Sequence, residues 1–290
     1  MITLFATPKN FNGIFKNIQL NALRSWRALS PDIQIIIFGD SKGSKDASQK
    51  INAEYIPNVK CSPQGTPYLS DLFQQADNLA RFSIMTFINA DIILPKNFLE
   101  VAINVSQNFK KFLMVGHRLD MDVNSIIDFK NSENNKYFWQ LVDKQSIRHA
   151  PSGIDYFVYN KNLWGNLPDF IIGRPGYDNW LIWKARRRLI PIPDATESVK
   201  AVHQNHHFNF HNITDDPKIV HESEGNFNRK LVKKKSLNIL DSTHQISNGN
   251  IVKKNDKNSR QRYWHRLPII FPECAIPIKL IRRLIINRIV

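Results

Sequence analysis

Short apolar segments alternate with amphipathic ones along the first part of the chain. Residues 2–7 and 33–40 are mostly apolar and rich in β-branched side chains, which predicts two strands of a parallel sheet covered on both faces. Residues 14–29 lie between them with apolar side chains at helical spacing, and the sequence "SPD" that follows ends the helix. The pattern predicts a strand–helix–strand unit at the start of the chain.

The same alternation continues to about residue 118. We expect helices at residues 71–80 and 97–109 and strands at residues 84–94 and 111–118. Strands and helices that alternate in this way favour a sheet with helices on both faces. The predicted fold class is therefore α/β, a Rossmann-like α/β/α sandwich with a mostly parallel central sheet.

The second half of the chain is less regular. Residues 120–149 are polar and weakly periodic, which predicts a long surface excursion. Residues 153–164 alternate like a strand, residues 177–188 have helical spacing, and residues 189–195 have the pattern of a short strand. Residues 201–212 end the part of the sequence that is expected to be ordered.

The C-terminal part differs from the rest in composition. Residues 227–262 are rich in Asn, Ser and Lys and poor in aromatic side chains, which predicts a flexible linker. Residues 263–290 are apolar and basic together. We therefore expect one folded domain over residues 1–226, then a basic linker, and then a basic C-terminal extension.

The positive charge of the chain is concentrated at this end. The formal net charge is +15, and residues 229–290 hold 15 Lys and Arg against 3 acidic residues, which is +12 of that total. The preceding residues carry the remaining +3, close to neutral for a soluble enzyme. A nucleic-acid footprint is expected to spread over a folded face, so the sequence predicts no nucleic-acid partner.

Cysteine content and hydropathy bear on the compartment. Cys61 and Cys274 form neither a disulfide framework nor a metal motif, which favours a reducing compartment. The first ten residues lack a basic region ahead of an apolar one, so no signal peptide is expected. No apolar run reaches the roughly 18 residues of a spanning helix. We predict a cytoplasmic protein that is not integral to a membrane.

Polar residues follow the predicted strands at their carboxyl ends, where open α/β sheets bind ligands. The first strand ends at Ala6 and Thr7, the second ends at Asp40, and Asp91 lies inside an apolar segment, residues 87–94. A carboxylate in apolar surroundings is costly unless it is paired, so we expect Asp91 to hold a divalent cation. Asp40 either contacts a nucleotide or serves as a turn or helix-cap residue.

Further candidate residues lie between positions 174 and 211. Asp178, at the start of a predicted helix, is either a helix N-cap or a functional carboxylate. Arg174 either clamps a phosphate or is a solvated loop charge. Imidazole is the commonest metal ligand, and four histidines cluster here: His203, His206, His207 and His211. We expect His203 to face the crevice, because it follows a strand-like segment, and His207 and His211 to be exposed.

Taken in order, these motifs resemble those of the GT-A-type nucleotide-sugar glycosyltransferases, in particular the bacterial family 2-like group. The sequence "NAD" (89–91) is the counterpart of the Asp-x-Asp metal motif, and "SGIDYFVYNKNLW" is the counterpart of the acceptor-side segment. "GYDNWL" matches the helix start that carries the base, and "PDATESVKAVHQ" matches the strand with a metal-binding His. The resemblance covers residues 1–212. It implies a GT-A-type fold, sugar transfer from a nucleoside diphosphate to a hydroxyl acceptor, and Mn²⁺ or Mg²⁺ as cofactor.

The resemblance also implies roles for single residues. Asp178 would be the catalytic base, and Asp91 and His203 would be the metal ligands. The nucleotide-sugar donor would contact Ala6, Thr7, Asp40, Asn89, Asp91 and Arg174. The acceptor, a glycan or lipid-linked glycan as in polysaccharide biosynthesis, would contact Gly153, Asp155 and Asn179.

Two positions depart from the family pattern. Asn89 replaces the first acid of Asp-x-Asp, and Tyr177 replaces the Glu that precedes the catalytic Asp. A single base opposite the leaving diphosphate predicts direct displacement with inversion. Asp178 could instead hold an acceptor hydroxyl, so the stereochemical outcome stays open.

The end of the chain predicts a basic amphipathic helix. Lys279, Arg282 and Arg283 lie on one side, and apolar side chains spread across the other. Such a helix either docks on an anionic membrane surface, which would make the protein peripheral on the inner face of the membrane, or packs on the domain itself. The alternative function is a metal-dependent hydrolase that uses Asp91 and the cluster from His203 to His211.

Overall fold

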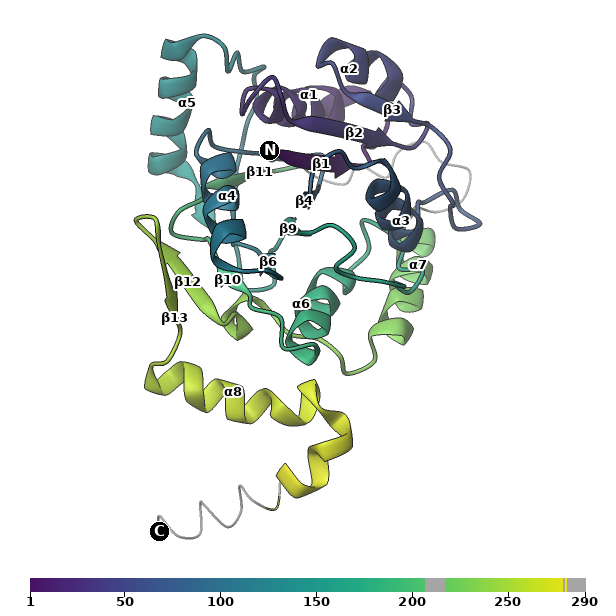
Figure 1. Cartoon of the computed structure of the whole chain (residues 1–290). Helices are drawn as coiled ribbons and strands as arrows, with labels where there is room; N and C mark the ends of the chain where they lie inside the picture. The colour runs from purple at the N-terminus through teal and green to yellow at the C-terminus, as the bar shows by residue number, and fades with distance from the viewer. Residues whose placement is uncertain (207–216, 279, 281–290) are drawn as a thin grey trace.

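The central feature of the computed structural model, which describes residues 1–206, 217–278 and 280, is a six-stranded sheet in the order β3-β2-β1-β4-β9-β6 (Figure 1). Neighbouring strands are parallel from β3 to β4, and β9 is antiparallel to both β4 and β6. The predicted mostly parallel sheet is confirmed. Its strands are β1 (Ile2–Ala6), β2 (Gln34–Phe38), β3 (Glu54–Ile56), β4 (Ile84–Ile88), β6 (Leu113–Met114) and β9 (Tyr156–Asn160).

Helices cover both faces of this sheet, which confirms the predicted three-layer sandwich. Side chains alternate along β1, so that Phe5 packs on one face and Leu4 on the other. The Phe5 face is covered by α3 (Leu69–Leu79) and α6 (Tyr177–Arg187). The opposite face is covered by α1 (Gly13–Arg27), α2 (Ser44–Lys50) and α4 (Phe98–Asn108).

The predicted strand at residues 84–94 is in fact two strands in different sheets. β4 ends at Ile88, a turn closed by the Ile92 N–H donating to the Asn89 carbonyl (3.2 Å) follows, and β5 (Ile92–Ile93) enters a second sheet. The order of this sheet is β5-β11-β7-β8. Its other strands are β7 (Arg118–Met121), β8 (Ile147–Arg148) and β11 (Ala201–Gln204). The break places Asp91 at the junction of the two sheets, where its side chain leaves the apolar core.

Residues 120–149, expected to be a surface excursion, contain secondary structure. Helix α5 (Ser132–Gln145) follows β7, and its Phe138 and Val142 pack in a small separate core with Met121 and Phe129. Only two side chains of α5 are buried, so its apolar pattern was too sparse to predict a helix. The surface-excursion prediction was wrong.

Residues 227–262, expected to be a flexible linker, are folded. They contain the end of α7 (Pro217–Val232), the short helix η1 (Ile239–Asp241), the hairpin β12 (His244–Ser247) and β13 (Asn250–Lys253), and the start of α8 (Lys257–Ile270). β12 pairs in parallel with β10 (Pro193–Asp194), and Ile246 is fully buried. The few apolar residues of this segment lie in the core. The high average polarity of the segment gave no indication of this.

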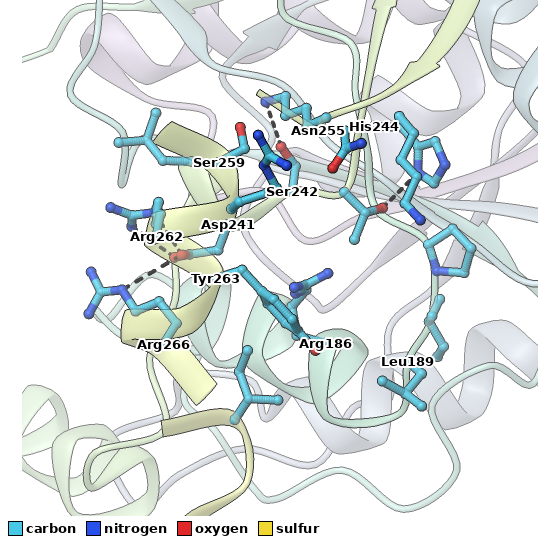
Figure 2. A pocket seen from close by; sticks show the side chains of 18 residues that line it. Arg186, Leu189, Asp241, Ser242, His244, Asn255, Ser259, Arg262, Tyr263 and Arg266 are labelled. Carbon is cyan, nitrogen blue, oxygen red and sulfur yellow. Dashed lines mark hydrogen bonds and ion pairs between the residues drawn. The ribbon is translucent and has the colours of Figure 1, made fainter. Parts of the chain in front are cut away.

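An ion pair fixes the same segment against α8. Arg262 donates to both oxygens of the nearly buried Asp241 carboxylate, at 2.7 and 2.9 Å (Figure 2). The prediction of a flexible linker was therefore wrong, because a bidentate pair between η1 and α8 requires a fixed geometry.

The C-terminal extension is only partly described. α8 packs beside α6, where the Trp183 indole N–H donates to the Ile269 carbonyl at 2.8 Å, and the short helix η2 (Pro272–Cys274) follows (Figure 1). Lys279, Arg282 and Arg283, on which the predicted amphipathic helix depends, lie outside the described residues. Within the described part of the chain, no helix is both long enough and apolar enough to cross a membrane.

Candidate functional site

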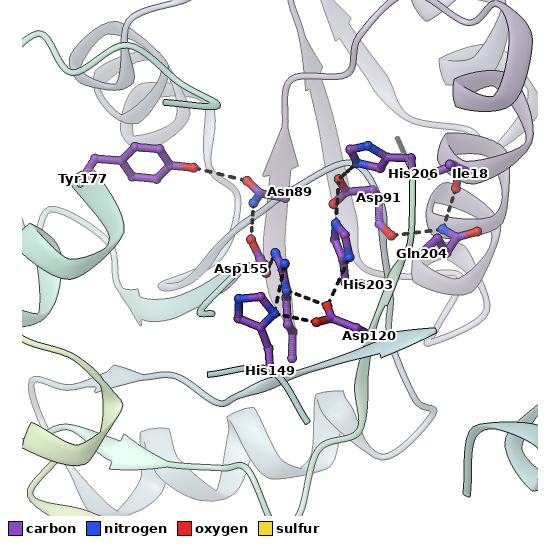
Figure 3. Close-up of polar contacts among 11 residues, drawn as sticks. Ile18, Asn89, Asp91, Asp120, His149, Asp155, Tyr177, His203, Gln204 and His206 are labelled. Atoms are coloured by element: carbon purple, nitrogen blue, oxygen red, sulfur yellow. Dashed lines mark hydrogen bonds and ion pairs between the residues drawn. The ribbon is translucent and has the colours of Figure 1, made fainter. Parts of the chain in front are cut away.

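Seven of the eleven predicted site residues line a cavity of about 410 Å³ at the carboxyl ends of β1 and β4: Thr7, Asn89, Asp91, Asp155, Arg174, Asp178 and His203. It is bordered by the β1–α1 loop, the β4–β5 turn, the loop before α6 and the end of β11, and Figure 3 shows its polar contacts. The cavity is lined by polar residues from all of these segments, among them Thr7, Lys9, Asn89, Asp91, Arg118, Asp155, Arg174, Asp178, His203 and His206.

Asp91 and two histidines form the centre of this cavity. The Asp91 Oδ2 atom lies 3.3 Å from His206 Nε2 and 3.7 Å from His203 Nε2. One ligand atom from each of the three residues lies within 4.8 Å of the others, a spacing that one metal ion can bridge. The other carboxylate oxygen, Oδ1, is buried and has no hydrogen-bond partner among the described residues. Sequence reasoning predicted that Asp91 and His203 face each other, and the structure places them so.

Hydrogen bonds also fix the backbone at Asp91. Gln204, which is fully buried, donates from its side-chain amide to the Asp91 carbonyl (3.0 Å) and to the Ile18 carbonyl (2.8 Å). The strand register sets His203 opposite Ile92, the residue after Asp91. The two ligand-bearing segments are therefore fixed to each other by the β5–β11 pairing and by this amide.

Charge around Asp91 favours its ionised form. Burial alone raises the pKa of a carboxyl group, but the His206 hydrogen bond and the positive charges of His203, His206 and Lys9 outweigh it. The net result is a pKa below the ordinary value for Asp91. Burial lowers the pKa of His203, against the opposing effect of Asp91, so its ring is neutral at pH 7. An ionised carboxylate beside a neutral imidazole is the protonation state that binds a metal.

Asp120 supports His203 from behind. Its Oδ1 lies 3.3 Å from His203 Nδ1, at ion-pair distance but without the alignment of a hydrogen bond. The arrangement directs Nε2 toward Asp91 and matches the carboxylate–histidine pairs that orient metal ligands. Sequence reasoning missed Asp120 because its segment was expected to be a loop. The polar and apolar alternation of "RLDM" was a signal for a strand, but the register that sets Asp120 beside His203 comes from the β7–β11 pairing in the fold.

Arg118 links this group to Asp155. It lies 2.9 Å from Asp120 Oδ1, and its Nη1 donates to Asp155 Oδ2 at 2.9 Å. Burial lowers the pKa of Arg118, but Asp155, Asp120 and Asp91 together raise it above its ordinary value. Arg118 therefore stays charged and holds two of the acids in place.

The contacts of Asn89 account for the neutral residue at this position. Its amide nitrogen donates to Asp155 Oδ1 at 2.5 Å, and its amide oxygen accepts a long hydrogen bond from the Tyr177 hydroxyl at 3.4 Å. An aspartate could not donate to Asp155. Asn89 and Tyr177, the two departures from the family pattern, are thus in contact with each other.

Asp178 lies in the first turn of α6. Gly176 caps the helix in the left-handed region (φ 115°), and Asp178 Oδ1 accepts from the backbone N–H groups of Gly176 (3.2 Å) and Asn179 (2.8 Å). Burial raises the pKa of Asp178 to about 6, against those two hydrogen bonds, and the charge of Asp155 adds to the rise. The residue is not the N-cap, which was the structural alternative.

Two further cations face the cavity. Lys9 lies 4.6 Å from the centroid of the Phe15 ring, and burial lowers its pKa. Arg174 is not a solvated loop charge, because its Nη2 atom lies 2.6 Å from the buried carboxylate of Glu224 on α7. Lys9 was missed by sequence reasoning, since a single Lys in a loop carries no pattern.

Four predicted contacts are not among the cavity lining. Ala6 is buried within β1, and Asp40 is exposed and accepts from the Tyr55 hydroxyl at 2.5 Å. Gly153 lies under the His149 ring, which a Cβ atom would meet at 2.3 Å, and Asn179 contacts the Leu237 N–H through its carbonyl. His207 and His211 lie outside the described residues.

Comparisons with known proteins give likenesses in structure alone. No protein-family model matches the chain, and none of the curated proteins matches its sequence. Among solved structures, the chain is similar to S. aureus TarS 1-349 in complex with UDP-GlcNAc, at 12% identity and a TM-score of 0.49, over 71% of this chain and 59% of that one.

It is also similar to Mycobacterium tuberculosis glucosyl-3-phosphoglycerate synthase with Mg²⁺ and UDP, at 12% identity and a TM-score of 0.48, over 88% and 87% of the two chains. The same enzyme with Mn²⁺, UDP-glucose and phosphoglyceric acid gives 13% identity and a TM-score of 0.44, over 72% and 73%.

Proposed function

We propose that this protein is a glycosyltransferase that moves a sugar from a nucleoside-diphosphate donor to a hydroxyl acceptor, assisted by Mn²⁺ or Mg²⁺. One observation carries the proposal. Asp91, His203 and His206 meet in a cavity that also contains Lys9, Arg174 and the partly buried carboxylate of Asp178. A cation site, anion-binding side chains and a base are the groups that sugar transfer from a diphosphate requires.

The residues present fit a divalent cation. One carboxylate oxygen and two imidazole nitrogens form the donor set, and the buried Asp91 Oδ1 has no partner in the described part of the chain. Imidazole ligands suit Mn²⁺ better than Mg²⁺, which favours oxygen. The cation, when bound, would neutralise charge on the leaving diphosphate.

The other side chains would position the donor and accept the proton. Lys9 and Arg174 would face the phosphates, and Glu224 would keep Arg174 in place through their ion pair at 2.6 Å. Thr7 and Asn89 line the same cavity and would contact the donor. Asp178 would accept the proton of the acceptor hydroxyl, because a carboxyl with a pKa of about 6 is ionised at pH 7 and more basic than an exposed one. With Asp178 as the base, we propose direct displacement with inversion.

For the acceptor we propose a glycan or a lipid-linked glycan. The support is the basic C-terminal region, in which residues 229–290 carry +12. Such a region would hold the protein on the inner face of an anionic membrane, beside a lipid-linked acceptor. Removal of residues 275–290, which leaves α8 intact, should reduce sedimentation with anionic vesicles, and unchanged sedimentation would refute membrane docking through these residues.

Calorimetry tests the proposed activity. UDP and GDP are titrated into the protein with Mn²⁺, with Mg²⁺ and with EDTA. We expect one of the nucleotides to bind, and to bind more tightly when a metal is present. Metal that binds tightly without any effect of nucleotide would favour the metal-dependent hydrolase instead. Absence of nucleotide binding under all three conditions would refute the glycosyltransferase.

A further inference from the structure

A second cavity, of about 420 Å³, lies among the C-terminal elements (Figure 2). Its walls are the end of α6, the segment after it, η1, the β12–β13 hairpin and one face of α8. That face presents Ser259, Arg262, Tyr263 and Arg266, which follow the i, i+3, i+4, i+7 spacing of a single helix side. None of the residues that line this cavity lines the cavity around Asp91. We refer to it as the basic cavity.

The basic cavity has a large excess of positive charge. One acidic side chain, Asp241, lines it together with six basic ones: Arg186, Lys253, Lys254, Arg260, Arg262 and Arg266. Ion pairs with aspartates of the protein neutralise part of this charge. Arg262 is paired bidentately with Asp241, and Lys254 Nζ lies 2.9 Å from Asp194. Arg266 Nε lies 3.6 Å from Asp241 Oδ1, but this carboxylate is already paired with Arg262.

Three of the cations have no ion pair in the described ranges 1–206, 217–278 and 280: Arg186, Lys253 and Arg260. The Arg186 guanidinium lies 4.9 Å from the Tyr263 ring centroid, and its buried Nε has no acceptor among those residues. A buried donor without an acceptor is costly, which indicates a missing partner. The partial negative charge at the C-terminal end of α6 stabilises the positive charge of Arg186. It does not compensate the charges of Lys253 on β13 and Arg260 on α8.

We propose that the basic cavity binds a phosphate-bearing anion, with Arg186, Lys253 and Arg260 as its charged contacts. Guanidinium groups match phosphate oxygens in geometry as well as in charge. The volume lies within the range of about 300–1,000 Å³ typical of small-molecule sites. Leu189 (74% exposed) and Leu240 (47%) also line the cavity, so the phosphate could belong to a free metabolite or to a lipid headgroup.

The test compares a cavity variant with a control of equal charge change. Lys253→Gln/Arg260→Gln removes two exposed cations of the cavity, and Arg24→Gln/Lys50→Gln removes two exposed cations of α1 and α2. Each protein, in EDTA and low salt, is titrated with inorganic pyrophosphate. Each is also sedimented with vesicles of phosphatidylcholine, with and without phosphatidylglycerol. Pyrophosphate bound in the Asp91 cavity is common to all three proteins and cancels in the comparison.

We expect the cavity variant to bind at least one probe about tenfold more weakly than wild type, and the control to bind like wild type. Weakening with pyrophosphate alone indicates a free phosphate ester, and weakening with vesicles alone indicates a lipid headgroup. Equal binding by wild type and the cavity variant would overturn the proposal, as would equal weakening in the control. Metal-dependent nucleotide binding should be unchanged in the cavity variant, so the two proposals fail separately.

Discussion

The two cavities are nearly equal in volume, about 410 and 420 Å³, but they differ in charge balance. The cavity around Asp91 is lined by Lys9, Arg118 and Arg174 and by three aspartates, and ion pairs join Arg118 to Asp155 and Arg174 to Glu224. The basic cavity has six cations and one acid. A balanced set of charges holds its own side chains in position before a ligand arrives, whereas an unbalanced set is completed by the ligand. This difference fits the proposed reaction site in one case and the proposed anion receptor in the other.

The largest effect is expected from Asp178→Asn. Loss of a general base lowers the rate by about 10²–10⁴-fold, so kcat should fall by that factor with little change in the donor KM. The wild-type rate should be low below pH 6 and rise through pH 6, where Asp178, with a pKa of about 6, becomes ionised. Sugar-transfer kinetics across pH 5–8 measure both effects. Normal turnover by the variant would remove Asp178 as the base.

Asp91→Asn should abolish the effect of metal on nucleotide binding. Loss of a residue that only orients a ligand costs about 10–100-fold, so loss of the ligand itself should cost at least 100-fold in activity. Asp40→Asn is the matched control, because Asp40 is exposed and outside the cavity lining. Calorimetry with UDP or GDP and Mn²⁺ makes the measurement. An Asp40 variant as impaired as the Asp91 variant would show that the nucleotide extends to the end of β2.

Asp120→Asn should weaken Mn²⁺ binding by about 10–100-fold without removing any atom near the cation. The reason is that Asp120 faces His203 Nδ1 at 3.3 Å and so keeps Nε2 turned toward Asp91. Asp122→Asn, an exposed change on the same segment, is the control. Titration with Mn²⁺ measures the affinity, and a melting curve checks the fold. Equal Mn²⁺ affinity in all three proteins would show that the His203 ring needs no carboxylate support.

Arg262→Gln tests the C-terminal side of the comparison and should have the smallest effect. It leaves the Asp241 carboxylate, 7% exposed, with the Asn238 N–H and the more distant Arg266 as partners. We expect urea unfolding to show a loss of about 1–2 kcal/mol in the free energy of unfolding. Arg260→Gln, which removes no ion pair of the described residues, should stay within about 0.5 kcal/mol of wild type. Equal stability of the two variants would contradict a folded segment at 227–262.

The sheet and its helices could be predicted because their patterns are strong. β1 and β2 combine β-branched side chains with uninterrupted burial, and the helix between them has a clear apolar face. The segments that were mispredicted have few buried side chains each. In α5 only Phe138 and Val142 are buried, and in the β12–β13 hairpin only Ile246 is. One or two buried residues are too few to show the hydrophobic periodicity by which a helix or strand is predicted.

Some residues of the site could likewise be predicted from the sequence, and others could not. Asp91 could be predicted because a charge inside an apolar run is conspicuous, and His203 because it follows a strand. Asp120 and Lys9 could not, since their positions depend on which segments the fold brings together. Asp40 was predicted as a contact from its place at the end of β2, but its carboxylate accepts from Tyr55 outside the cavity lining. The end of a strand selects candidates and does not fix where their side chains point.

The junction at Asp91 also ties cation binding to folding. The three proposed ligands come from positions 91, 203 and 206, and the pairing of β5 with β11 brings them together. The unfolded chain therefore lacks this arrangement of ligands, and an ion that occupies it binds the native state more tightly than the unfolded state. Each tenfold increase in free ion above its Kd should then add about 1.4 kcal/mol of native-state stability. Thermal denaturation across a manganese series would thus report on this junction without any knowledge of the sugar or its acceptor.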